Sequence, residues 1–356
     1  MKTQRLAVAL LVAVGCLTLV AWRAEACAGC RNPSLGVTRG SEGALDAGAT
    51  RLGASVTGTT VHVVHEAGCR DTSDCDEMPV QETYFHDQHL YPLELRLIGE
   101  YGLSETFGIE AQVPFRSVTT TIEYTDADGA HYEPLDPGVH HRDETVFGIA
   151  DPWLLLRVGT TVQKWWLAAR PGVSIPLGRT EENPFTLGDQ GLRHQHIQLG
   201  SGTFDPVAVV EASRAFDALQ LQFFAQGQVP FYENGHGYRA SWRVYGGAAV
   251  GRKLVSELVG FGGVEASHEA AETWDGQTRQ DGNLGRSELL LAAMLSQTFG
   301  TTMLSLSVRI PVWRQIVTGD EPPGTLSSPV VLSLSATHVF GGQQPAQPRH
   351  ASRATR

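Results

Sequence analysis

The strongest constraint on the fold is a run of alternating apolar and polar residues between Leu93 and Phe115. Apolar side chains occupy every second position on both sides of a short polar break at 102–105. A period of two is typical of a strand with two different faces, and two such runs around a short turn predict a β-hairpin. Similar hairpins recur along the chain, and little other sequence remains to cover their apolar faces. The pattern therefore predicts a closed barrel whose apolar face is covered by lipid.

The alternation continues along the chain at regular intervals. We predict strands at residues 51–65, the two halves of 93–115, 147–158, 165–177, 204–214, 218–231, 238–251, 255–266, 286–299, 303–313 and 329–340. This gives about twelve strands, whose connections alternate between short and long. Outer-membrane barrels have an even number of strands, short periplasmic turns and long outer loops. The predicted fold class is therefore all-β, an antiparallel transmembrane β-barrel with about twelve strands.

The N-terminus is typical of a secretory signal peptide. Basic residues precede an apolar run at 6–21, and Ala24-Glu25-Ala26 forms a small-x-small cleavage site. We predict that residues 1–26 are removed; a retained membrane anchor and a lipid-modified Cys27 are the alternatives. No later stretch approaches the ~20 apolar residues that a membrane helix needs. Export without a helical anchor favours the bacterial outer membrane.

The chain divides into four predicted parts. A periplasmic N-terminal segment with a Cys-x-x-Cys motif (27–50) follows the signal peptide (1–26), and a barrel (51–340) is followed by a disordered tail (341–356). The tail is rich in Gln, Pro and Arg. The net charge of -11 argues against a nucleic-acid partner. The predicted partners are outer-membrane lipid, a small solute and the barrel-assembly machinery that inserts such barrels.

Charged residues occur on the strand faces opposite the apolar face. These lumen candidates are Glu94, Arg96, Glu100, Glu110, Arg157, Arg170, Glu211, Arg239, Arg243, Glu257, Glu265 and Arg309. A row of Gln within 218–231 also indicates a wet interior, because hydrocarbon would leave the amides unsatisfied. If the charges pair across the lumen, the barrel is plugged and largely structural. If they line an open path, they set the selectivity of a channel.

Four segments carry a family resemblance: YGLSETFGIEAQVPF, GIADPWLLLRV, ARPGVSIPLGR and LGSGTFDPVAVVEAS. They are similar to segments of the outer-membrane transporter proteins associated with the meta-cleavage pathway of phenol degradation. The similarity spans residues 93–251 and continues more weakly to 340. The resemblance implies a barrel fold and the transport of a hydrophobic compound.

Four cysteines remain after the predicted cleavage: Cys27, Cys30, Cys69 and Cys75. An even number in an oxidising compartment favours disulfides. Cys69 and Cys75 share one polar loop, and we predict that they pair. For Cys27 and Cys30 we predict a disulfide as well, with a metal pair or a redox pair as the alternatives.

Histidines occur in pairs on the predicted outer loops. The candidate metal ligands are His86 and His89, His140 and His141, and His194 and His196. Imidazoles with carboxylates nearby suit Zn²⁺, Cu²⁺ or Ni²⁺, whereas the alternative is an ordinary polar surface. No HExxH, phosphate-loop or GxSxG motif is present in the sequence, so we predict that the chain is not an enzyme.

The function that these patterns favour is passive uptake or export of a small, hydrophobic solute through an outer-membrane channel. One alternative is a barrel whose His-rich outer loops bind a divalent transition metal as its sole cofactor. A plugged structural barrel is a further alternative, and a soluble secreted β-protein is the main rival fold.

Overall fold

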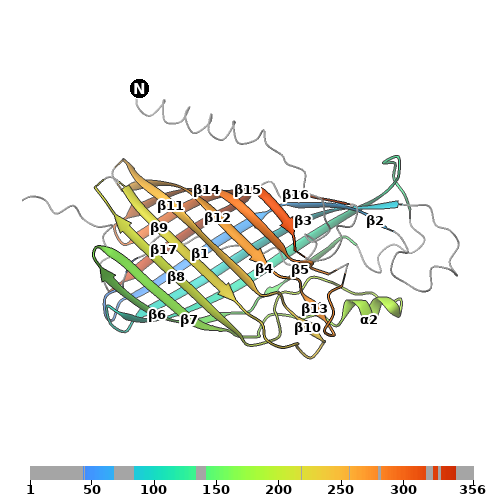
Figure 1. Cartoon of the computed structure of the whole chain (residues 1–356), viewed down its shortest axis with the longest axis horizontal. Coiled ribbons are helices and arrows are strands. Elements are labelled where there is room, and N and C mark those ends of the chain that lie inside the picture. The colour runs from blue at the N-terminus through green and yellow to red at the C-terminus, as the bar shows by residue number, and fades with distance from the viewer. Residues whose placement is uncertain are drawn as a thin grey trace, which may run out of the picture.

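The computed structural model describes residues 43, 45–67, 84–133, 142–217, 219–255, 257–279, 282–317, 324–327 and 330–341. In this part of the chain, strands run obliquely around one elongated barrel (Figure 1). The predicted signal peptide, the four cysteines, His140, His141 and the tail after 341 lie outside the described residues. What the sequence predicts for them stays a prediction.

The barrel wall is one closed antiparallel sheet. Its segments are β1 (Thr50–Thr59), β2 (Val61–Ala67), β3 (Tyr84–Gly102), β4 (Phe107–Asp126), β5 (Glu144–Ile149), β6 (Trp153–Val162), β7 (Trp165–Ser174), β8 (Asp205–Ala215), β9 (Leu219–Gln228), β11 (Arg243–Val255), β12 (Leu258–Glu269), β14 (Arg286–Phe299), β15 (Thr302–Ile316), β16 (Gly324–Ser327) and β17 (Val331–Phe340). Strands adjacent in sequence are adjacent in the wall, and pairing of β1 with β17 closes it. Three strands are broken into two segments each (β1–β2, β5–β6 and β16–β17), so the fifteen described segments form twelve strands. The predicted fold class is confirmed.

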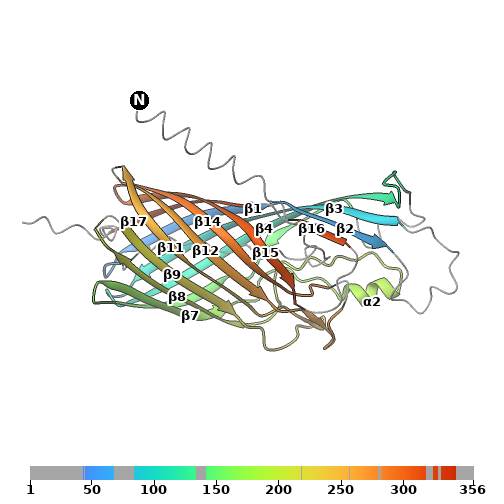
Figure 2. The same ribbon diagram turned by 45° about the horizontal axis from the view of Figure 1, so that its top comes forward.

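The strands β3 and β4 are longer than the sequence predicts. Their pairing runs from Gly102 opposite Gly108 at the turn to Tyr84 opposite Asp126 at the far end. The segment β2 pairs with the outer part of β3, and Figure 2 shows the three strands extending beyond the rest of the barrel. The predicted start of this strand at Leu93 was wrong, because residues 84–92 belong to β3 as well. The hairpin continues because residues 117–124 are rich in Thr, Val, Ile and Tyr, which suit paired strands.

The two faces of the wall differ as the alternation predicts. In β3, Leu93, Leu95 and Leu97 point outward and are 50%, 38% and 43% exposed. Glu94 and Arg96 lie between them and point inward, with 3% exposure each. Outward apolar side chains of this kind occur on β4, β6, β8, β11, β12, β14, β15 and β17 as well. An outward apolar belt around a polar interior is the arrangement of a barrel that faces lipid.

The two ends of the barrel also differ. Short turns join β3 to β4, β6 to β7, β8 to β9, β11 to β12 and β14 to β15 at one end, which we call the short-turn end. The long-loop end carries α2 (Pro184–Asp189) and a small sheet of β10 (Tyr238–Arg239) and β13 (Thr273–Trp274). The helix begins there because the Asn183 side chain accepts hydrogen bonds from the backbone N–H groups of Phe185 and Thr186, and Pro184 follows it. No helix among the described residues has the length and apolar character needed to cross a membrane.

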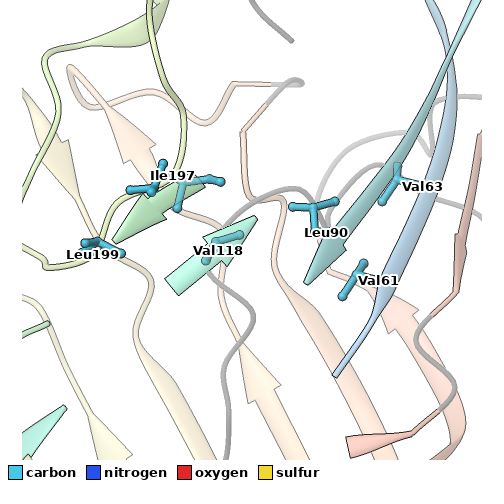
Figure 3. Close-up of a cluster of buried hydrophobic side chains, with 7 residues drawn as sticks. Val61, Val63, Leu90, Val118, Ile197 and Leu199 are labelled. Atoms are coloured by element: carbon cyan, nitrogen blue, oxygen red, sulfur yellow. The ribbon is translucent and has the colours of Figure 1, made fainter. Parts of the chain in front are cut away.

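A hydrophobic cluster closes part of the long-loop end. Figure 3 shows Ile197 and Leu199, from the connection between β7 and β8, beside side chains of the strands. The cluster consists of Val61, Val63, Leu90, Val118, Val146, Ile197 and Leu199, which are all buried. The connection therefore folds back over the barrel mouth, held by the burial of apolar surface.

Candidate functional site

An ion-pair layer fills the lumen near the short-turn end. The Glu100 carboxylate lies 2.7 Å from the Arg51 guanidinium and 2.6 Å from that of Arg157. Each of these side chains is at most 2% exposed. The layer comes from β1, β3 and β6, and below it Leu45, Ala49 and Val339 form a small buried cluster. Water is thus excluded from this arc of the lumen.

A second ion-pair group lies farther along the same arc. Arg170 bridges Glu110 at 3.1 Å and Glu211 at 2.5 Å, which joins β4, β7 and β8. Gln112 donates a 2.6 Å hydrogen bond to Glu110 and accepts one of 2.9 Å from Arg96. The charged side chains therefore form a continuous network across β3, β4, β7 and β8.

The network ends at Glu94, which faces two arginines. Its carboxylate lies 2.6 Å from Arg96 and 2.7 Å from Arg116. The guanidinium of Arg96 also lies over the Trp153 ring, 5.1 Å from the ring centroid. This contact places an aromatic face beside a cation at the boundary between the packed lumen and the space above it.

The arc formed by β14, β15, β17 and β1 carries smaller side chains. Arg309 donates a 2.9 Å hydrogen bond to Ser333 and lies 3.7 Å from Glu265, to which the Tyr245 hydroxyl also donates. A gap of about 270 Å³ remains on this side of the lumen. It is lined by Ser55, Thr57, Met294, Ser305, Ser307, Ser333 and Ser335. Small hydroxyl side chains leave space beside Arg309 here, whereas larger ion-paired side chains occupy the other arc.

Two adjoining hollows occupy the half of the lumen toward the long-loop end. The space between their atoms, part of which is open to solvent, is about 570 and 540 Å³. Both are lined by Arg96, Arg116, Trp153, Gln228, Arg243 and Glu269. Arg286 and Asp151 each belong to one of the two linings. Arginines of the linings have carboxylate partners: Glu94 pairs with Arg96 and Arg116, and Glu288 lies 3.7 Å from Arg286. We name these two adjoining hollows together the outer cavity.

At the mouth of the outer cavity, Asp151 holds the connection between β7 and β8 against the barrel wall. Asp151 lies between β5 and β6, where the strand is interrupted. Its carboxylate accepts hydrogen bonds from the Gly178 N–H at 2.8 Å, the Ser201 N–H at 2.6 Å and the Ser201 hydroxyl at 2.9 Å. Gly178 and Gly200 approach so closely that a Cβ on Gly200 would lie 2.7 Å from the Gly178 Cα and 2.5 Å from the Asp151 carboxylate. We call this contact the Asp151 clasp and residues 178–203 the cap segment.

The clasp unites three of the four sequence segments that carry the family resemblance. Asp151 belongs to GIADPWLLLRV, Gly178 to ARPGVSIPLGR, and Ser201 to LGSGTFDPVAVVEAS. Sequence analysis did not identify these residues as a site. One signal in the sequence could have pointed to them: in each of these segments, glycine or another small residue stands near Asp or Pro at the end of a strand. Glycine at such a position marks a close approach of two backbones.

The small sheet beside the cap adds a buried aromatic pair. The rings of Tyr238 and Trp274 lie 4.7 Å apart, and both side chains are buried. Burial, together with the neighbouring Glu272 carboxylate, raises the pKa of Tyr238 well above its ordinary value. The Tyr238 hydroxyl therefore stays protonated and lines the outer cavity as a neutral group.

Most of the predicted lumen residues point into the barrel. Glu94, Arg96, Glu100, Glu110, Arg157, Arg170, Glu265 and Arg309 are buried there, and Glu211 and Arg243 are partly buried. Two positions differ from the prediction. Arg239 is exposed in β10 because β11 begins only at Arg243, and Glu257 is exposed in the turn between β11 and β12, 3.6 Å from Lys253.

The structure describes two of the three predicted histidine pairs, and the metal sites predicted there stay predictions. His86 and His89 lie in β3, three residues apart, and so point to opposite faces of the strand. His194 and His196 are buried in the cap segment, where their rings contact each other at 5.0 Å. Within the described residues, one group of three potential ligands is close enough to hold a metal ion, and it consists of His62, Asp87 and His89.

The closed sheet, the apolar belt and the polar lumen define the class of the protein: it is an outer-membrane β-barrel. The short-turn end is then periplasmic and the long-loop end faces outward. The apolar belt places lipid around the wall, whereas insertion by the barrel-assembly machinery stays a prediction.

Comparison with solved structures finds the barrel fold in an outer-membrane channel. The crystal structure of an outer membrane channel from Pseudomonas putida F1 superposes with a TM-score of 0.56 and 12% identity, covering 86% of this chain and 100% of that one. A mutant of the monoaromatic hydrocarbon channel TodX gives a TM-score of 0.43, with 9% identity and 83% and 91% coverage. A Pseudomonas aeruginosa FadL homologue gives 0.37, with 13% identity and 82% and 90% coverage. No protein-family model matches the chain, and no curated protein does.

Proposed function

We propose that the chain is an outer-membrane channel through which a small solute passes passively. The outer cavity is the observation that carries the proposal, because it is a polar hollow within the lumen, lined by side chains from several strands of the wall. A separate serine-lined gap lies on the arc of β14, β15, β17 and β1. The fold shared with the Pseudomonas putida channel supports the same class of function.

The lining of the outer cavity indicates which solute fits. Trp153 provides an aromatic surface, and Arg96, Arg116, Arg243 and Arg286 provide hydrogen-bond donors with positive charge. The solute that matches is a small molecule with an apolar ring and an anionic group, which guanidinium groups bind strongly. This refines the hydrophobic solute that the sequence favours, and the link to phenol degradation remains part of the proposal.

The ion current through the refolded chain in a planar bilayer tests this proposal, with benzoate as a blocking probe. We expect benzoate to block the current and benzyl alcohol, which lacks the charge, to block it far less. Arg243→Gln should weaken the benzoate block about tenfold, because a charge-assisted hydrogen bond contributes ~1.5–3 kcal/mol. The matched control Arg239→Gln, on the exposed β10, should leave the block unchanged.

Equal block by the two probes, or an unchanged block in Arg243→Gln, would contradict the proposed solute class.

The buried ion-pair layer favours a second candidate function, a plugged barrel that acts through its outer end. An inserted chain that carries no current would support that candidate.

A further inference from the structure

His62, Asp87 and His89 form a cluster on the outer face of the barrel extension. His62 of β2 lies directly opposite His89 of β3, and Asp87 is two residues from His89 on the same face. The three side chains are 37%, 32% and 48% exposed, so ions in the medium reach them. Along β3 the same face continues with Tyr91 and Leu93, which are 44% and 50% exposed. The cluster thus lies just beyond the apolar belt, where the barrel leaves the outer surface of the membrane.

The geometry of the cluster fits a metal ion. The Asp87 Oδ1 atom lies 2.7 Å from His62 Nε2 and 3.5 Å from His89 Nε2, and the three ligand atoms lie within 4.8 Å of one another. The two imidazole rings are parallel within 3° and 4.3 Å apart, so both present their edges to the same carboxylate. A tetrahedral Zn²⁺ site with bonds of about 2.0 Å separates its ligand atoms by about 3.3 Å. The side chains would rotate toward that arrangement when the ion binds.

The residue types determine the class of metal. Ca²⁺ and Mg²⁺ take oxygen ligands, whereas imidazole nitrogen suits Zn²⁺, Cu²⁺ and Ni²⁺. Two imidazoles with one carboxylate form a three-ligand set of the kind that leaves a coordination position for water. We propose that His62, Asp87 and His89 bind a divalent transition metal ion of the Zn²⁺ class at the outer boundary of the membrane.

A metal ion at this position would tie β2 to β3. The other edge of β2 pairs with β16, where His62 lies opposite Ser327. Coordination across the His62–His89 pair would therefore add a side-chain link to the backbone pairing of β2 with β3.

Isothermal titration of the refolded full chain in detergent micelles with ZnCl₂ tests the proposal. We expect one Zn²⁺ per chain at this site, and His62→Ala and His89→Ala should each weaken binding about tenfold or more. Asp87→Asn should weaken it as well. The matched control His236→Ala removes an exposed histidine of another outer connection and should leave the affinity unchanged.

Two results would overturn the proposal. The first is the absence of Zn²⁺ binding in the wild-type chain. The cluster would then be a hydrogen bond between His62 and Asp87, with the His89 ring stacked on that of His62. The second is binding that persists unchanged in both His→Ala variants, which would place the ion elsewhere, for instance at cysteines that all variants share. A Cu²⁺ electron-paramagnetic-resonance spectrum provides an independent check. Coupling to two nitrogens in the wild type should fall to one in either variant.

Discussion

Glu100→Gln is expected to destabilise the barrel by about 3–5 kcal/mol, the range measured when one partner of a buried ion pair is removed. The substitution keeps the shape of the side chain but leaves Arg51 and Arg157 facing each other without the carboxylate that lies 2.7 and 2.6 Å from them. Both arginines are almost fully buried, so water cannot replace the lost partner at low cost. Urea unfolding of the refolded chain in lipid vesicles measures the effect.

The matched control is Glu257→Gln, which also removes a carboxylate from an ion pair. Glu257 is exposed in a turn and lies 3.6 Å from Lys253, so its loss should cost no more than about 1 kcal/mol. Adding Arg51→Gln to Glu100→Gln should recover part of the loss, because one uncompensated cation is removed. A cost for Glu100→Gln as small as that of the control would show that water enters this layer and that the lumen is not sealed there.

Asp151→Ala is expected to release the cap segment from the barrel mouth. The carboxylate accepts three hydrogen bonds, from the Gly178 N–H and from the Ser201 N–H and hydroxyl. Its removal leaves these buried donors unsatisfied, at about 1–3 kcal/mol each. A total of roughly 3 kcal/mol corresponds to an increase in local opening of about a hundredfold, since 1.4 kcal/mol is a factor of ten.

Limited proteolysis with trypsin measures this opening, because Arg179 and Arg193 both belong to the cap segment. We expect cleavage at these residues to accelerate strongly in Asp151→Ala while the strands remain protected. Asp189→Ala is the matched control, since it removes an exposed carboxylate of the same segment. Identical cleavage rates in the wild type and in Asp151→Ala would mean that the hydrophobic cluster around Leu199 holds the cap without the clasp.

The sequence was sufficient to predict the strands of the wall and most of the side chains that point into the lumen, because both follow from the local alternation of apolar and polar residues. Leu95 faces lipid and Glu94 and Arg96 face inward for the same reason, the period of two along one strand. Arg239 and Glu257 were misplaced because alternation does not define where a strand ends. A shift of a few residues at a strand end moves a side chain from the wall to a loop or turn.

The Asp151 clasp and the proposed metal site could be recognised only in the structure, because each depends on contacts between residues far apart in the sequence. Asp151 meets Gly178 and Ser201, which are 27 and 50 residues away, and the conformation of a long connection decides that contact. His62 meets His89 because of the register between β2 and β3. The sequence shows both histidines but not the register, and it paired His86 with His89 by proximity along the chain. The strand geometry instead places those two on opposite faces.

The most direct test of the channel is the single-channel conductance of the refolded chain, without its predicted signal peptide, in a planar bilayer. We predict discrete conductance steps that are smaller than those of sixteen-stranded porins, because arginine side chains fill one arc of this twelve-stranded lumen. The conductance steps should be larger in Asp151→Ala, because the cap segment is released from the barrel mouth in that variant. Inserted barrels that stay silent in both the wild type and Asp151→Ala would contradict a solute path and support the plugged barrel.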